Sequence, residues 1–328
     1  MNIDFKVVYQ SYDCSIALSE EMKSYYIRNL TDVVRQLSAD LDIPPTCKIV
    51  VPDDFEKELK EFQLKYNLVV GFTKNDMGTA YAKVLDYTED GILYSVVFVN
   101  KAIIFALQSD NIIENLEEQK DQFTYLRKIA INVIHHELIH VYDNYMNGTL
   151  YEEMENNNGI LSKQMRNIAI VVWKEYYACR RTASTYYMDL ENDIKDWKQQ
   201  VLDVEEKIKD VINQYRTHGD INVVDRELQS RVTILLNYAA YFQGHLFRYS
   251  DFNTLCQIVQ IINEQISSSF MYDIWSKMFY KLNELFITYL NWDSNAFDNL
   301  SQTILKCWNN VGVFPEVTGN GGLYYSIP

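Results

Sequence analysis

The segment from His135 to His140 reads HHELIH and holds the residues of this chain whose types and spacing best fit catalytic chemistry. His136 and His140 are four residues apart, so on a helix they lie one turn apart on the same face. Two imidazoles at that spacing can bind one Zn²⁺ ion. Glu137 follows the first histidine, where its carboxylate can take a proton from a metal-bound water. The spacing therefore predicts His136 and His140 as zinc ligands and Glu137 as the general base.

A catalytic zinc site needs a third protein ligand and leaves its fourth position to water. We expect Glu175 to be this ligand, on a helix predicted over residues 161–188. The neighbours of Glu175 on that helix are apolar, so its carboxylate lies on or beside a buried face, where a carboxylate needs a partner or a metal. The acidic segment 150–159, which we expect to be a loop, supplies three rival ligands: Glu152, Glu153 and Glu155.

Other polar residues near the motif have more than one interpretation. Asp143 shares the helix face of the two histidines and could be a third ligand, a hydrogen-bond acceptor for a ligand imidazole, or a solvated aspartate. His135 points about 100° away from that face. A hydrolase also needs a donor that stabilises the developing oxyanion. Candidates for this donor are Tyr176 and Tyr177, which we favour, and Arg180, Arg181, His218 and His245, although packing or exposure is the simpler interpretation of each.

HELIH followed by a helical Glu-x-x-Ala, from Glu175 to Ala178, resembles the gluzincin branch of HExxH metallopeptidases. The strings HELIHVYD and EYYACR are similar to those of the mitochondrial inner-membrane peptidase that processes an ATP synthase subunit. The pattern also resembles minimal gluzincin domains of the ImmA/IrrE-like and SprT-like kinds, over about residues 80–185. The resemblance implies His136, His140 and Glu175 as ligands, Glu137 as general base, and substrate binding along an edge strand. The interval from His140 to Glu175 is longer here than in compact gluzincins.

The periodicity of the chain predicts the elements that would position these residues. Strands are expected over 3–9 and 46–51, and an antiparallel hairpin over 79–87 and 92–100. An amphipathic helix over 18–41 begins after Ser19, another helix covers 53–64, and a long helix runs from 121 to 145 and stops at Asn147-Gly148. From residue 191 the chain is almost entirely helical, with a break at 218–220 and a terminal tail after residue 316. These ranges are all read from the printed sequence.

The fold class that follows is α+β. We expect a small sheet packed on a zincin-like pair of active-site helices, followed by a mostly helical C-terminal half. The predicted domains are residues 1–190, a metallopeptidase domain, and residues 191–328, a helical domain of unknown role.

Composition restricts the partners and the compartment. The 328 residues carry a net charge of −15 with dispersed lysines and arginines, which argues against nucleic-acid binding. The chain shows no signal sequence and no apolar run long enough to span a membrane. Its five cysteines, Cys14, Cys47, Cys179, Cys256 and Cys307, are scattered and odd in number, which is typical of reduced thiols in a cytoplasmic protein. We therefore expect no membrane partner and no nucleic acid.

Three functions are compatible with these residues. The first is a zinc-dependent peptidase that hydrolyses peptide bonds of a specific intracellular protein. The second is a catalytically silent zincin-like module with a helical protein-interaction domain. The third is a helical interaction protein without a metal. Glu137 favours the first, because a purely structural metal site has no use for a general base beside its ligand.

Overall fold

The computed structural model describes residues 1–9, 17–70, 74–75, 78–107, 119–156, 159–186, 189–248 and 251–328. The chain forms two compact units. Unit 1 comprises residues 1–145 and 184–188, and unit 2 comprises residues 146–183 and 189–328. The predicted division at residue 190 differs from this grouping, because the helix that holds Glu175 clusters with the C-terminal helices.

Unit 1 is built on a four-stranded mixed sheet with the strand order β1-β2-β6-β5. β1 (Asn2–Phe5), β2 (Lys48–Val51) and β6 (Ile92–Val99) are parallel, and β5 (Ala82–Glu89) pairs antiparallel with β6. The predicted hairpin is confirmed, with register Ala82↔Val99 and a turn at Asp90 and Gly91, both of which have positive φ. β3 (Lys74–Asn75) and β4 (Gly78–Thr79) form a separate short ladder.

The two faces of this sheet carry different residues because side chains alternate along each strand. One face packs against α2 (Phe55–Lys65) through Val50, Leu85 and Phe98. The other face presents Ser95 and Asp86, and Asp86 accepts a hydrogen bond from Asn144 of α5 (Lys120–Asn156). α5 therefore covers the second face of the sheet.

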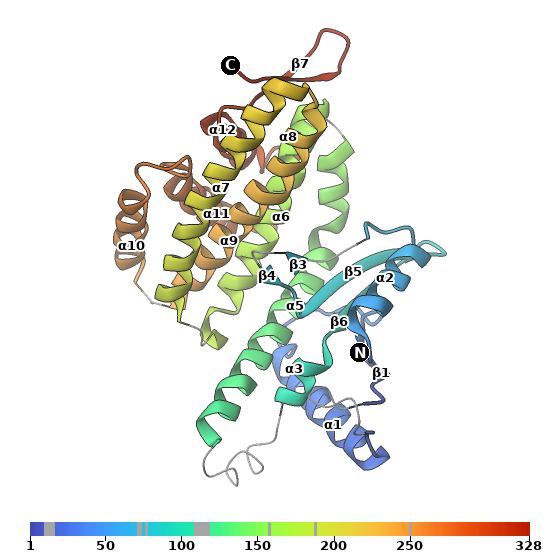
Figure 1. The fold of residues 1–328 in the computed structure, drawn as a ribbon. Helices are drawn as coiled ribbons and strands as arrows, with labels where there is room; N and C mark the ends of the chain where they lie inside the picture. Colours follow the sequence, from blue (N-terminus) through green and yellow to red (C-terminus); the bar gives the residue numbers. More distant parts are fainter. Residues whose placement is uncertain are drawn as a thin grey trace. The chain divides into compact units, whose positions relative to one another are not determined.

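The remaining helices of unit 1 also follow local signals. α1 (Glu20–Leu37) begins where predicted, because the Ser19 hydroxyl accepts a hydrogen bond from the Met22 N–H. α3 (Lys101–Ala106, labelled in Figure 1) is capped in the same way, because the Asn100 side-chain oxygen accepts from the Ala102 N–H. α1 and α3 pack together through Tyr26 and Phe105, whose ring centroids are 5.0 Å apart.

α5 is longer than the sequence predicts. The helix passes through Asn147-Gly148 and ends at Asn156, so the predicted stop at Gly148 and the predicted loop over 150–159 are wrong. Gly148 has a negative φ, and an added Cβ there would meet nothing within 4 Å. A glycine in ordinary helical geometry costs about 1 kcal/mol relative to alanine, which packing of neighbours such as Tyr151 and Met154 outweighs.

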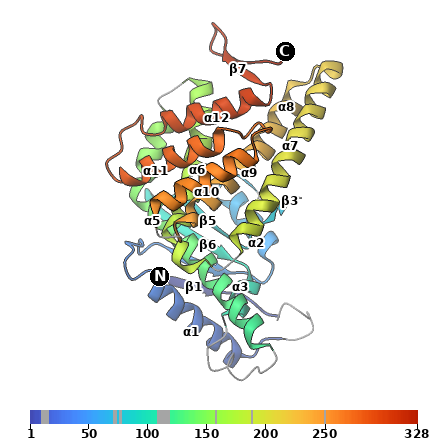
Figure 2. The same ribbon diagram turned by 90° about the vertical axis from the view of Figure 1, so that its left-hand side faces the viewer.

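Unit 2 is a helical assembly in which α6 (Ile160–Arg181) packs against α9 (Thr233–His245) and α12 (Asp298–Asn310). α7 (Leu190–His218) also packs on α9, and Figures 1 and 2 show α6, α7 and α9 side by side. The other elements of unit 2 are α8 (Ile221–Glu227), the π-helical turn η2 (Leu228–Val232), the short helix η3 (Leu246–Arg248), α10 (Phe252–Gln265) and α11 (Ile274–Ile287). The short helix η1 (Ala183–Thr185) begins with the last residue of a unit 2 segment and continues into unit 1. The predicted break is confirmed, because α7 ends at the left-handed Gly219 and Asp220 caps α8.

The core of unit 2 is aromatic, with Trp173, Trp197, Trp275 and Trp308 all fully buried. α6 and α9 approach closely at Gly244, where an added Cβ would lie 2.7 Å from the Cys179 Cβ and 2.7 Å from the Tyr176 carbonyl oxygen. This close approach requires glycine. The predicted α+β class is confirmed by the mixed sheet of unit 1 and the helical C-terminal half.

The chain ends in a hairpin rather than the predicted tail. β7 (Phe314–Val317) pairs antiparallel with β8 (Leu323–Ser326), and Gly321 takes a positive φ in the turn. The Tyr325 hydroxyl donates to Asp225 of α8, which fixes the hairpin to unit 2. Among the helices that the structure describes, none combines the length and the apolar character that a bilayer crossing requires.

Candidate metal site

The two motif histidines face one another on α5. The Nε2 atoms of His136 and His140 are 2.9 Å apart, and their ring planes meet at 81°. Both side chains are half-buried, next to fully buried residues such as Leu138 and Ile139. Two imidazole nitrogens at this distance share either a proton or a cation, because two lone pairs facing each other repel.

His135 has a different environment. Its Nδ1 lies 3.2 Å from the Thr185 hydroxyl, and Asn132 donates to the same hydroxyl at 3.0 Å. Thr185 belongs to the segment 184–188 that clusters with unit 1. The 100° step between neighbouring helix residues therefore directs His135 to η1, while the other two histidines meet each other.

Glu137 is half-buried on α5 and has a basic neighbour that the sequence did not indicate. Burial lowers the pKa of Lys83 on β5, and the nearby Glu137 carboxylate partly offsets this effect. Lys83 and Glu137 are 54 positions apart, and no local pattern connects them. Only the placement of α5 on the sheet makes them neighbours.

The residues that the sequence offered as alternative ligands lie further along α5. Asp143 is fully buried, so the interpretation as a solvated aspartate is wrong. Glu152 and Glu153 are exposed on the helix instead of on a loop. The side chain of Glu155 lies outside the described residues, as does Cys14.

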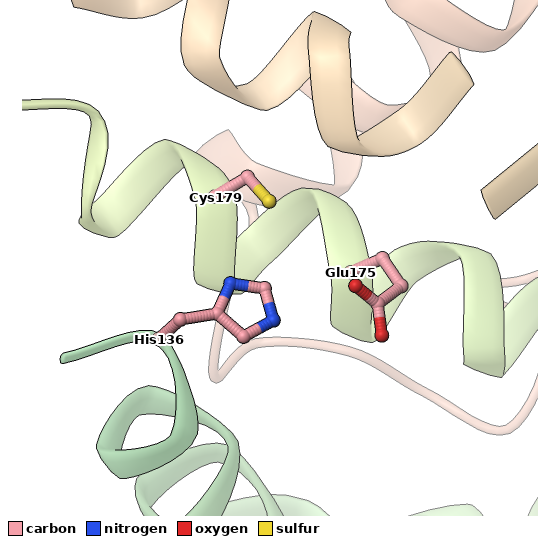
Figure 3. A group of neighbouring side chains, drawn as sticks. All are labelled: His136, Glu175 and Cys179. Atoms are coloured by element: carbon pink, nitrogen blue, oxygen red, sulfur yellow. The ribbon is translucent and has the colours of Figure 1, made fainter. Parts of the chain in front are cut away.

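Glu175 and Cys179 lie one turn apart on α6 (Figure 3). Glu175 is half-buried. Burial raises the pKa of Tyr238 on α9, and the negative charge of the Glu175 carboxylate raises it further. Cys179 is fully buried beside Gly244. Its thiol is nevertheless a chemically competent metal donor.

The candidate oxyanion donors are largely engaged in other contacts. The Tyr176 hydroxyl accepts from Arg180 at 2.7 Å, and the Tyr177 hydroxyl accepts from Arg181 at 3.0 Å. His245 is fully buried with its ring 4.5 Å from that of Tyr241. His218 is exposed at the end of α7, where its Nδ1 accepts from the Asp220 N–H.

A half-buried carboxylate connects the motif helix to the sheet. Asp86 accepts from the Ser95 hydroxyl and from the Asn144 side-chain amide, both at 2.6 Å. Asn144 lies one turn after His140, on the same helix face. This link sets the distance of the motif helix from the edge strand β5. Sequence reasoning did not predict the bond between Asp86 and Asn144, because Asp86 is one of several acids in the hairpin.

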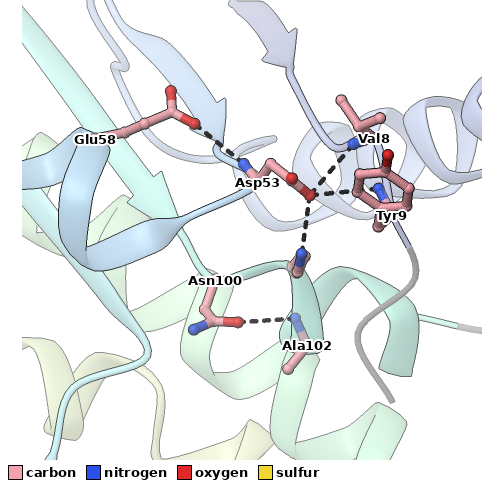
Figure 4. Close-up of polar contacts among 7 residues, drawn as sticks. Val8, Tyr9, Asp53, Glu58, Asn100 and Ala102 are labelled. Atoms are coloured by element: carbon pink, nitrogen blue, oxygen red, sulfur yellow. Dashed lines mark hydrogen bonds and ion pairs between the residues drawn. The ribbon is translucent and has the colours of Figure 1, made fainter. Parts of the chain in front are cut away.

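A second polar cluster lies where β1, β2 and β6 end (Figure 4). Asp53 Oδ1 accepts from the Lys101 ammonium at 2.8 Å and from the Val8 and Tyr9 N–H groups at 3.3 and 3.4 Å. Burial by itself would raise the pKa of Asp53, but these donors outweigh burial and lower the pKa. The Asp53 carboxylate thus links the ends of the three strands, and this structural role accounts for the cluster.

The four described cysteines, Cys47, Cys179, Cys256 and Cys307, are free thiols. Comparison of the chain with family models, with curated proteins and with solved structures gives no significant match.

Proposed function

We propose that this chain is a cytoplasmic zinc-dependent peptidase that hydrolyses peptide bonds of a specific protein substrate. The observation that carries the proposal is the pair of imidazoles on α5, whose Nε2 atoms are 2.9 Å apart with Glu137 adjacent in sequence. The assignment of the reaction rests on this motif and on its resemblance to gluzincins.

The histidine pair fits a zinc ion by simple geometry. Zn–N bonds of about 2.0–2.1 Å with a tetrahedral angle place the two ligand nitrogens about 3.3 Å apart. The observed 2.9 Å between the Nε2 atoms is within a few tenths of an ångström of that value. Small rotations of the two rings would close the difference.

For the third ligand we propose Glu175. Glu175 and Cys179 lie one turn apart on α6 and offer a carboxylate and a thiol to a metal ion (Figure 3). A carboxylate with two histidines leaves a position for water, which suits catalysis, whereas a thiolate as fourth ligand would close the site. Zinc binding by Cys179 would therefore support only the second candidate function, the catalytically silent zincin-like module.

In the proposed mechanism each residue has a separate task. A bound zinc ion would lower the pKa of a water molecule and polarise the substrate carbonyl. His136 and His140 would hold the ion, and Glu137 would take the proton from the attacking water and deliver it to the leaving amine. Lys83 lies close to this general base, and the Glu137 carboxylate partly offsets the lowering of the Lys83 pKa by burial.

Zinc content tests the proposal directly. Purified wild-type protein, reconstituted with zinc and dialysed, should retain about one ion per chain, as a single three-ligand site requires. His140→Ala should lose the ion. His135→Ala is the matched control, because it removes a neighbouring imidazole that contacts Thr185. Equal zinc in all three proteins would contradict the ligand assignment.

Two further variants distinguish the open site from the closed one. Glu175→Ala should lower zinc affinity, whereas Cys179→Ala should leave both zinc and hydrolysis in place. Zinc loss in Cys179→Ala together with absence of hydrolysis in the wild type would favour the silent module.

A further inference from the structure

Arg180, in the last turn of α6, is stacked between two phenylalanine rings of unit 2. Its Cζ lies 3.7 Å from the ring centroid of Phe247 on η3 and 3.6 Å from that of Phe286 on α11. Stacking on both faces holds the planar cation in place, and it leaves the edges of the guanidinium as the only positions for polar partners.

One edge of the guanidinium is occupied and the other is not. Nη1 donates to the Tyr176 hydroxyl at 2.7 Å and to the Asn283 side-chain oxygen at 2.8 Å. Within the described ranges, Nε and Nη2 have no acceptor and no carboxylate pairs with Arg180. Burial removes part of the water around this guanidinium and thereby lowers its pKa. No counter-ion within the described ranges replaces that water.

Another arginine of the same helix shows the usual alternative. Arg166 is buried, and it donates to the Met154 carbonyl oxygen and pairs with the Asp298 carboxylate. Among the described residues, the buried Arg166 thus has an internal acid, whereas the contacts to the half-buried Arg180 are neutral oxygens and aromatic rings. A cation held between two rings with two parallel N–H donors left can bind a carboxylate.

We propose that the Nε–Nη2 edge of Arg180 binds a carboxylate of the peptide substrate, either an acidic side chain or a free C-terminus. As a statement about substrate, the inference rests on the proposed peptidase function. Arg180 lies on the same helix as the proposed ligand Glu175, about 7.5 Å further along the helix axis and about 140° around it.

The experiment measures binding without hydrolysis, on the zinc-free full-length protein. The probes are three alanine-based pentapeptides: one with an internal glutamate and an amidated end, one with a free C-terminal carboxylate, and one neutral and amidated. The readout is the ¹⁵N–¹H resonance of the Arg180 Nε. We expect a saturable shift with one or both carboxylate peptides and none with the neutral peptide. Which of the two peptides shifts it identifies the source of the carboxylate.

The conservative variant Arg180→Lys keeps the charge but loses the two parallel donors, so affinity for the carboxylate peptide should fall by at least about tenfold. Arg181→Lys is the matched control, since Arg181 makes the equivalent contact to Tyr177 with a less close ring contact. Equal affinity of Arg180→Lys and wild type would overturn the proposal, as would a wild-type resonance that no carboxylate peptide shifts.

The two proposals fail in different ways. A protein that binds the carboxylate peptide through Arg180 but cleaves no peptide would contradict the peptidase function alone. An active peptidase that binds neutral and acidic peptides equally would contradict the role of Arg180 alone.

Discussion

Two helices carry residue pairs with the same spacing and opposite chemistry. On α5, His136 and His140 bring two nitrogens within 2.9 Å of each other. On α6, Tyr176 and Arg180 are also four residues apart, and the arginine donates to the phenol at 2.7 Å. The first pair can offer two lone pairs to a cation, whereas the second leaves N–H donors for an anion.

The comparison shows that helical spacing decides only which side chains meet. The residue types then determine the charge of the ligand, and the surroundings determine whether that ligand is needed. Phe247 and Phe286 exclude water from the faces of Arg180 without neutralising its charge. On α5, the half-buried imidazoles retain partial access to solvent, which a hydrolytic site requires.

The largest effect is expected for Glu137→Gln, which isolates the chemistry of α5. The amide keeps the size and polarity of the side chain but cannot accept the proton of the attacking water. Hydrolysis should fall by about a hundredfold or more while zinc content stays at the wild-type level. Both quantities should be measured on one preparation, and full hydrolysis by the zinc-loaded variant would refute the role of Glu137.

The next effect concerns the packing that supports the α6 pair. Gly244→Ala places a Cβ within 3 Å of Cys179 and of the α6 backbone, so α6 and α9 must separate. We expect a loss of about 1–3 kcal/mol in the free energy of unfolding, measured by urea titration. Gly148→Ala on α5 is the control, because its Cβ meets no atom within 4 Å. That variant should gain about 0.5–1 kcal/mol. If the free energy of unfolding fell in both variants, the expected difference between the two glycines would be wrong.

A smaller effect is expected when the phenol of the α6 pair is removed. Tyr176→Phe leaves one N–H of the half-buried Arg180 without its acceptor, while the bond to Asn283 remains. The free energy of unfolding should fall by about 1 kcal/mol. Tyr177→Phe is the comparison, because the Arg181 contact there is longer, at 3.0 Å. A greater loss in Tyr177→Phe would reverse the proposed ranking.

The smallest effect tests an ion pair of unit 1, between Asp53 and Lys101. The lowered pKa of Asp53 means that its contribution to stability is present above the ordinary value of 3.8 and is lost as pH falls through the folded value. Lys101→Met removes the closest donor, so the pKa of Asp53 should rise and acid unfolding should begin at higher pH. An NMR titration of the Asp53 carboxyl carbon measures this, and an unchanged pKa would contradict the assigned cause.

Local signals in the sequence predicted much of the fold. Ser19 marked the first residue of α1, and Gly219 with Asp220 marked the break between α7 and α8, because capping and left-handed glycines act within one turn. Local rules were wrong at Gly148 and at the C-terminus. There, burial of Tyr151 and Met154, and the bond from Tyr325 to Asp225, outweighed local preferences.

For the candidate site, the sequence by itself determined that His136 and His140 meet, since four residues make about one helical turn. Tertiary structure alone decided the rest: Lys83 beside Glu137, Asn144 bound to Asp86, and Arg180 between two rings from η3 and α11. These partners are 54, 58, 67 and 106 positions apart in sequence. No local periodicity encodes such pairs, because they form only when separate elements pack and the free energy of burial holds them together.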